Sequence, residues 1–409
     1  MIFLTGKLRR NIALRRNKYV SKKIVTFSFF ILLILFSSTF ILYQKPMITE
    51  GTQSISLIPV DVINTFQPAY EDHAPISVAG DGNLTTMAEA DSWEGNGTLE
   101  DPFIIEGYHI TLSGTPGSCI TLYNISLYVV VRDCLIGNAT YGVYLYNVSH
   151  FTSIGNVIYD SGYGMYILLS DHSIIMNTAF EEDYYPLYVE DSVNMNIEGC
   201  QFIESENVID GSGLAYSWIV NNTIMDAEYG IILEPGCIGN VIKQNSFSDL
   251  TFEGVFLANG ALGTKVMWNY FGGDSSGSAS DYSSPSTNEF SHNYYFEFTS
   301  FDLDNDGICD ESYSIIGSSG LRDYSPLMYP PLPPSWMYTP TDFQIEYGTS
   351  CFFQFEVDTY PPIAHWLVND TLHFDIDQNG VLLDRGNLLL GEYRLEVNAT
   401  DLYGQSVTG

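Results

Sequence analysis

Residues 141–168 read YGVYLYNVSHFTSIGNVIYDSGYGMYIL and contain two successive copies of one short pattern. In each copy a glycine precedes an apolar residue, and a second apolar residue follows two positions later: Val143 and Leu145, then Met165 and Ile167. Outward from this stretch, the first apolar residue recurs every 22 to 24 positions, at Ile120, Val143, Met165, Leu187, Ile209, Ile231 and Val255. A period of this length predicts a solenoid in which each repeat forms one coil.

The residues within each repeat predict strands and not helices. Short alternating runs rich in Val, Ile and Tyr are separated by Gly, Asn and Asp, and the LxxLxLxxN spacing of leucine-rich repeats is missing. One repeat cannot bury its apolar face alone, so we expect stacked coils to form a continuous core, each strand pairing with its equivalent in the next coil.

A second series of residues follows the same period, at Asp133, Asn156, Asn177, Gly199, Asn222, Asn245 and Asn269. Asparagine tolerates the left-handed backbone of a bend, and its amide can hydrogen-bond to an equivalent residue above or below. We therefore expect these residues to form a ladder at the bend between strands. Seven clear coils should run from Cys119 to Phe271, after a less regular one at Phe103–Ile105 and Ile110.

Both ends of the repeat carry more specific patterns. Residues 95–107, GNGTLEDPFIIEG, resemble the GxGTxxxPYxIxG opening of the parallel β-helices in the NosD-like and carbohydrate-binding/sugar-hydrolase group. Residues 302–310, DLDNDGICD, and 323–327, DYSPL, resemble the closing signature of that group. The resemblance implies an all-β fold, a right-handed parallel β-helix of the single-stranded, pectate-lyase-like kind over residues 75–330. It implies no particular activity, because this fold carries many functions.

The first 45 residues predict export. Residues 24–43 form an uncharged apolar run, which as a helix would span about 30 Å, the hydrocarbon thickness of a bilayer. Eight of the 15 basic residues precede this run, so the positive-inside rule places the remainder of the chain outside the cytoplasm. A transmembrane anchor and a cleaved signal peptide both fit. Eight Asn-x-Ser/Thr sites, at Asn83, Asn96, Asn124, Asn138, Asn147, Asn221, Asn369 and Asn398, agree with an extracytoplasmic glycoprotein.

Charge excludes one class of partner. Beyond Tyr43 only seven basic residues accompany the 49 acidic ones, so the clustered Lys and Arg that bind nucleic acid are absent. The same balance argues against a tightly bound anionic polysaccharide unless cations bridge the two. The six cysteines form no CxxC pair, which disfavours structural zinc and leaves both disulfides and buried thiols open.

After the proline-rich residues 330–334, short alternating stretches at 343–346, 352–357, 373–376 and 393–397 resemble an immunoglobulin-like or cadherin-like sandwich of the archaeal surface-protein type. We predict this small β-sandwich over residues 331–409, with Trp366 in its core, and expect the sequence to be a fragment because a final strand is missing. Residues 272–287, rich in Ser, Gly and Asp, predict an irregular insertion before the last coil.

The closing signature contains the candidate metal site. Asp302, Asp304, Asp306 and Asp310, with Gly307 at a turn, match the early positions of a calcium loop, while Tyr313 stands where the bidentate Glu is expected. Asp323 or Glu311 is a candidate for completing the ligand shell. We expect Ca²⁺ here, with a solvated acidic turn as the alternative.

Catalytic signatures of related β-helices are missing. The chain has no Asp-Asp pair and no GHG turn, and its RxK lies in the basic tail. Glu181, Glu182 and Asp183, beside Tyr184 and Tyr185, fit a glycosidase pair less well than a solvated loop tip. Arg132 is expected to be an exposed strand residue and not a lyase arginine. His109, His150, His172 and His292 form no ligand cluster in the sequence, and Met165, Met176, Met195 and Met225 fit core filling better than copper binding.

The sequence therefore favours a non-enzymatic cell-surface or secreted protein that contacts carbohydrate or another cell-surface partner. Tyrosines such as Tyr144, Tyr146, Tyr163 and Tyr166 are placed either to stack sugar rings or simply to cover the strands. Two alternatives remain open: a polysaccharide hydrolase or lyase with an unrecognised site, and a NosD-like metal-maturation factor.

Overall fold

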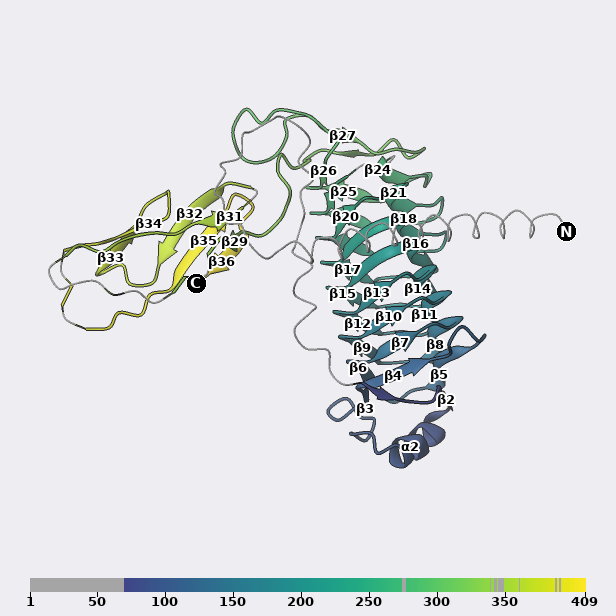
Figure 1. Cartoon of the computed structure of the whole chain (residues 1–409). Coiled ribbons are helices and arrows are strands. Elements are labelled where there is room, and N and C mark those ends of the chain that lie inside the picture. Colours follow the sequence, from purple (N-terminus) through teal and green to yellow (C-terminus); the bar gives the residue numbers. More distant parts are fainter. Residues whose placement is uncertain are drawn as a thin grey trace, which may run out of the picture. The chain divides into compact units, whose positions relative to one another are not determined.

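Short parallel strands, stacked one coil upon the next, form the middle of the chain (Figure 1). The computed structural model describes residues 70–273, 277–338, 340–341, 344, 349–359, 361–386, 388–389 and 391–409. Within these residues no helix is both long enough and apolar enough to span a bilayer. The expected segment at residues 24–43 lies outside the described residues.

Each coil contributes a strand to each of three faces, and every strand pairs in parallel with its equivalent in the next coil. Face A consists of β2 (Ile76–Ala79), β5 (Ser118–Ile125), β8 (Tyr141–Val148), β11 (Tyr163–Leu168), β14 (Tyr185–Glu190), the second halves of β16 (Gln201–Ser212) and β18 (Thr223–Leu233), β21 (Glu253–Leu257) and β24 (Gly277–Asp281).

Face B is a nine-stranded sheet of β3 (Phe103–Glu106), β6 (Val129–Arg132), β9 (Phe151–Ile154), β12 (Ile174–Met176), β15 (Asn196–Glu198), β17 (Trp218–Val220), β19 (Val241–Lys243), β22 (Lys265–Met267) and β25 (Glu289–Ser291). Face C consists of β1 (Glu71–Asp72), β4 (Tyr108–Thr111), β7 (Leu135–Gly137), β10 (Val157–Tyr159), β13 (Ala179–Glu181), the first halves of β16 and β18, β20 (Ser246–Ser248), β23 (Tyr270–Phe271) and β26 (Tyr294–Tyr295).

The predicted apolar series forms the core. All seven residues are buried, and they stand in register from β5 to β21, for example Val143 opposite Met165 and Met165 opposite Leu187. The helix α2 (Asp81–Ala90) packs on β2 and β5 and covers the first coil with Leu84 and Ala88. The repeat prediction is thereby confirmed.

The predicted ladder at the bend is two adjacent columns and not one. Asp133, Asn177 and Gly199 occupy a left-handed column on the surface, with φ between 47° and 65°. Asn156, Asn222, Asn245 and Asn269 belong to a buried column one residue later. The sequence did not separate the two columns because Asn suits both: its backbone tolerates the left-handed conformation, and its side-chain amide forms hydrogen bonds.

The buried column makes the inter-coil bonds that were expected of it. Asn222 Nδ2 donates to Asn245 Oδ1 at 2.9 Å, and Asn245 and Asn269 each donate to the next asparagine at 3.0 Å. Asn293 ends the series on Asp323, whose Oδ2 also accepts from Tyr295 Oη, both at 3.1 Å. Asp323 is fully buried, so it closes the ladder and is not available to the calcium loop.

The sequence predicted an irregular insertion at residues 272–287, but part of this segment is a regular strand. This strand is β24, which continues face A with Ala279 opposite Val255. Ala279 and Asp281 stand where the preceding coil carries Val255 and Leu257, and this loss of large apolar residues concealed the strand in the sequence. All six cysteines are buried free thiols, which decides between the two alternatives left open.

The chain beyond the coils is also built of strands, and these pair antiparallel. They are β27 (Tyr313–Ser314) with β28 (Arg322–Asp323), β29 (Ser335–Trp336) with β31 (Val357–Asp358), β30 (Phe352–Gln354) with β34 (Val381–Asp384) and β33 (Phe374–Ile376), and β32 (Ile363–Val368) with β35 (Val397–Asp401) and β36 (Ser406–Thr408). Trp366 is partly buried and packs against a small core that includes Phe355 and Phe374. Residues 343 and 345–346 of the first predicted strand lie outside the described residues.

One carboxylate is buried where the sequence expected a solvated loop tip. Glu182 is exposed with φ 58°, but Asp183 is only 1% exposed, at the corner between faces C and A. Its Oδ1 accepts from Ser161 N at 2.8 Å, and its Oδ2 has no hydrogen-bond partner among the described residues. Burial raises the pKa of Asp183 well above its ordinary value, although the bond from Ser161 opposes the shift. The side chain of Asp183 is therefore buried at this corner, whereas the sequence predicted a solvated loop tip.

We expect the substitution Asp183→Asn to stabilise the protein. The pKa of Asp183 is higher in the folded state than its unfolded value of about 3.9. The favourable contribution of Asp183 to folding is therefore complete below about pH 3.9, and it is lost as the pH rises through the folded-state pKa. The substitution should raise the free energy of unfolding by about 1–3 kcal/mol at pH 8 and by less at pH 5. Thermal melts at both pH values measure it. The exposed Asp226→Asn removes the same charge and serves as control; an equal gain from it would contradict the burial argument.

Candidate functional site

Three consecutive strands of face A, β8, β11 and β14, lie side by side in Figure 1. Six tyrosines lie on the outer side of these strands. We call them the tyrosine face: Tyr141, Tyr144, Tyr163, Tyr166, Tyr185 and Tyr188. Two rows run across the coils because equivalent residues stand in register. In one row the ring centroids of Tyr141, Tyr163 and Tyr185 are 5.2 and 5.1 Å apart, and in the other those of Tyr144, Tyr166 and Tyr188 are 5.6 and 4.9 Å apart.

The rows interlock with one another. Tyr163 meets Tyr166 edge to face at 5.3 Å, and Tyr163 meets Tyr188 in the same way at 5.8 Å. Within a row each ring covers the face of its neighbour, so solvent reaches mainly the ring edges and hydroxyls. A full ring face becomes available only where a row ends.

The second row ends at Asp210. This residue stands opposite Tyr188 in the register, and Ile232 follows it in the next coil. Aromatic rings resume nearby at Tyr229, which stacks on Phe252 at 4.7 Å. In the second row two successive coils lack an aromatic ring, at Asp210 and Ile232, before Phe256 follows, and we call the position beside Tyr188 the Asp210 gap. With coils about 4.8 Å apart, the missing ring leaves the outward face of Tyr188 next to a carboxylate.

Two carboxylates, those of Glu190 and Asp210, lie at this edge of the tyrosine face. Tyr166 Oη donates to Glu190 Oε2 at 2.9 Å. Burial, with Glu234 nearby, raises the pKa of Asp210 to about 6. Ionised Asp210 can accept hydrogen bonds from hydroxyl groups, and below that pH it loses acceptor capacity. Flat apolar rings beside such acceptors are the surroundings that a sugar ring requires.

Asp210 was not among the residues that the sequence singled out. The signal was present, because Asp210 stands 22 positions after Tyr188 where the preceding coils carry tyrosine. Of the four tyrosines named from the sequence, Tyr144, Tyr163 and Tyr166 join the two rows. Tyr146 stacks instead on Tyr123 at 4.6 Å, in a third row.

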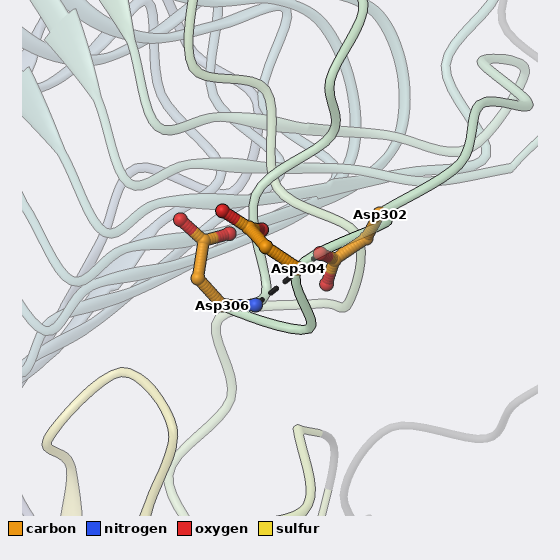
Figure 2. Close-up of side chains that lie close together, drawn as sticks. All are labelled: Asp302, Asp304 and Asp306. Carbon is orange, nitrogen blue, oxygen red and sulfur yellow. Dashed lines mark hydrogen bonds between the residues drawn. The ribbon is translucent and has the colours of Figure 1, made fainter.

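The acidic loop of the closing segment is a second candidate site. The side chains of Asp302, Asp304 and Asp306 lie close together (Figure 2). Each brings a carboxylate oxygen within 4.8 Å of the others. The loop is held by its own backbone: Asp306 N and Gly307 N donate to Asp302 at 3.2 and 2.9 Å. Repulsion, chiefly from Asp306, raises the pKa of Asp304. A divalent cation would relieve this repulsion.

Asp310 does not join that cluster. Its Oδ2 accepts from Leu303 N at 2.8 Å, so it holds the start of the loop. The structure therefore gathers three of the four predicted aspartates, while Asp323 is buried in the asparagine ladder. Spacing alone could not separate a ligand from a residue that shapes the loop.

The remaining candidates are dispersed. Met165 and Met195 are core residues, whereas Met176 and Met225 lie on the outer sides of two different faces. His150 and His172 do lie together, at the same corner in adjacent coils, with ring centroids 5.7 Å apart. Arg132 lies on the outer side of β6 and pairs with Glu106, as expected of an exposed strand residue.

Comparison with known proteins agrees with this architecture. Residues 100–297 match the family model described as periplasmic copper-binding protein (NosD). No curated protein matches the chain. The location in that description agrees with the extracytoplasmic placement expected from the sequence. Together with the stacked parallel coils, the match shows that this chain is a NosD-like right-handed parallel β-helix protein.

Proposed function

We propose that this is a non-enzymatic extracytoplasmic protein that binds carbohydrate on its tyrosine face. The Asp210 gap is the observation that carries the proposal. A sugar ring occupying the gap would stack on Tyr188 in place of the missing aromatic ring, and Asp210 would accept hydrogen bonds from its hydroxyls. Glu190 is already engaged by Tyr166, which leaves Asp210 as the acceptor for the ligand.

The surroundings of the gap favour a neutral sugar. Asp210 lies near Glu234, and the pKa values of Tyr163, Tyr185 and Tyr188 are raised, mainly by burial, with Asp210 adding to the effect. An anionic ligand would add a further charge to this negative site. Uncharged hydroxyls gain acceptors there without such repulsion.

Surface display is part of the same proposal. Residues 24–43 would serve as membrane anchor or cleaved signal, and residues 331–409 would form an immunoglobulin-like or cadherin-like sandwich that presents the coils. None of the eight Asn-x-Ser/Thr asparagines is buried, so each is accessible to glycosylation outside the cytoplasm. The acidic composition favours a solvated outer surface.

A metal-maturation role is the second candidate, and the family description favours it because NosD is described as copper-binding. The four methionines named from the sequence, Met165, Met176, Met195 and Met225, do not gather into a thioether site. Retention of Cu⁺ by the purified protein would favour this candidate over carbohydrate contact.

A neutral-glycan array probed with the full-length protein tests the main proposal. Tyr188→Ala should weaken binding of the best glycan about tenfold, equivalent to about 1.4 kcal/mol, because the stacking surface is lost. Wild-type affinity should fall below about pH 6 as Asp210 takes up a proton, and Asp210→Asn should remove that pH dependence.

Tyr123→Ala is the matched control, since Tyr123 lies on the same face in another row and is 40% exposed. If it weakens binding as much as Tyr188→Ala, the gap is not the site. Turnover of the bound glycan would replace the proposal with the hydrolase or lyase alternative.

We further propose that Asp302, Asp304 and Asp306 bind Ca²⁺ and lock the closing segment. Saturating Ca²⁺ should then raise the melting temperature, since a ligand at a hundred times its Kd adds about 2.7 kcal/mol of stability. Asp304→Asn should abolish the shift without destabilising the calcium-free protein, because it removes repulsion from Asp306.

Glu311→Gln is the control, a neighbouring exposed carboxylate outside the cluster. Asp310→Asn should lower stability with and without Ca²⁺ alike, because it loosens Leu303 without removing a ligand. Equal melting curves in Ca²⁺ and in chelator would overturn the assignment.

A further inference from the structure

The few basic residues of the coils all lie on one face. Between residues 70 and 300 the chain has three, Arg132, Lys243 and Lys265. Each projects from the outer side of face B, on β6, β19 and β22. The outer side of face B also carries Glu106, Glu198 and Glu289, so its charges balance in a chain whose formal net charge is −34.

Two of these lysines border a hollow. It has a volume of about 380 Å³, and its lining includes Trp218, Val241, Lys243, Lys265 and Met267. The register fixes the arrangement: Val241 lies between Trp218 and Lys265 in one row, and Lys243 stands opposite Met267 in the next. Val241 therefore lies at the base of the hollow, with Trp218 on one side and Lys243 and Lys265 at two diagonal positions.

The side chains around the hollow are available to a ligand. Trp218 is 53% exposed although it is a large apolar residue. The Lys243 side chain makes no ion pair within the described part of the chain. Lys265 Nζ lies 3.9 Å from Glu289 Oε2, but both side chains are more than half exposed, and such pairs contribute little. Glu198, on the far side of Trp218, accepts from Asn196 Nδ2 at 3.0 Å.

We propose that this hollow binds a uronic acid residue of an anionic polysaccharide. The sugar ring would stack on Trp218 above Val241, and its carboxylate would lie between Lys243 and Lys265. An acidic peptide offers carboxylates but no flat ring for the indole, so the combined aromatic wall and paired ammonium groups favour the sugar. The net charge of the chain does not reveal the balanced charge of face B, because most acidic residues of the chain lie outside this face.

This site is independent of the proposed tyrosine-face function, since the two use different residues on different faces. The experiment titrates the full-length protein at low salt with an oligosaccharide of glucuronic acid and with its methyl ester. The acid should bind at least about tenfold more tightly than the ester. Lys243→Gln and Trp218→Ala should each weaken binding of the acid about tenfold, and Tyr188→Ala should leave it unchanged.

Arg132→Gln is the matched control, because it removes the same charge from the same face five strands away from β19 and its partner Glu106 remains solvated. Loss of affinity equal to that of Lys243→Gln would show that only net charge matters and would overturn the site. Equal binding of acid and ester would do so as well. If polyglutamate displaces the oligosaccharide with the same affinity per carboxylate, the hollow recognises acidic protein and the sugar assignment fails.

Discussion

Hydrogen bonding from each coil to the next is the constraint on which the rest of this structure depends. Within a coil the strands lie on different faces and do not pair, so their backbone groups are satisfied only by the coils above and below. The buried asparagines add a second set of inter-coil bonds, from Asn222 through Asn293 to Asp323. An inward residue can be replaced only by one whose shape and hydrogen-bonding groups fit the equivalent residues in the coils above and below.

The same constraint creates the surfaces. Registered pairing places equivalent residues about 4.8 Å apart, so a residue type that recurs with the repeat becomes a continuous row. Tyr144, Tyr166 and Tyr188 form such a row, and Asp210 interrupts it. On face B the pairing of Val241 with Lys265 brings two lysines, 22 positions apart in the chain, to one hollow. Binding sites on this architecture arise where a row changes its residue type.

The period predicted the fold well because burial and strand pairing both depend on it. Ile120 to Val255 stand in register as the repeat required, and the family match covers most of the same coils. The candidate sites were predicted less completely. The aspartate pattern identified the loop but could not show that Asp310 supports Leu303, since ligand and support have the same spacing. Asp183 appeared to lie at a loop tip because its neighbours Glu181 and Glu182 are charged, yet the corner turns only Asp183 inward.

The sequence by itself determined the coil, since an apolar residue every 22 to 24 positions has one way to be buried in every repeat. It also determined the acidic character and the expected export, because these depend on composition and on a single uncharged run. Only the tertiary structure decided which polar residues face inward, which tyrosines share a row, and where the few lysines gather. Those outcomes depend on the exact register and on the turn at each corner, and a one-residue difference there moves a side chain from the solvent to the core.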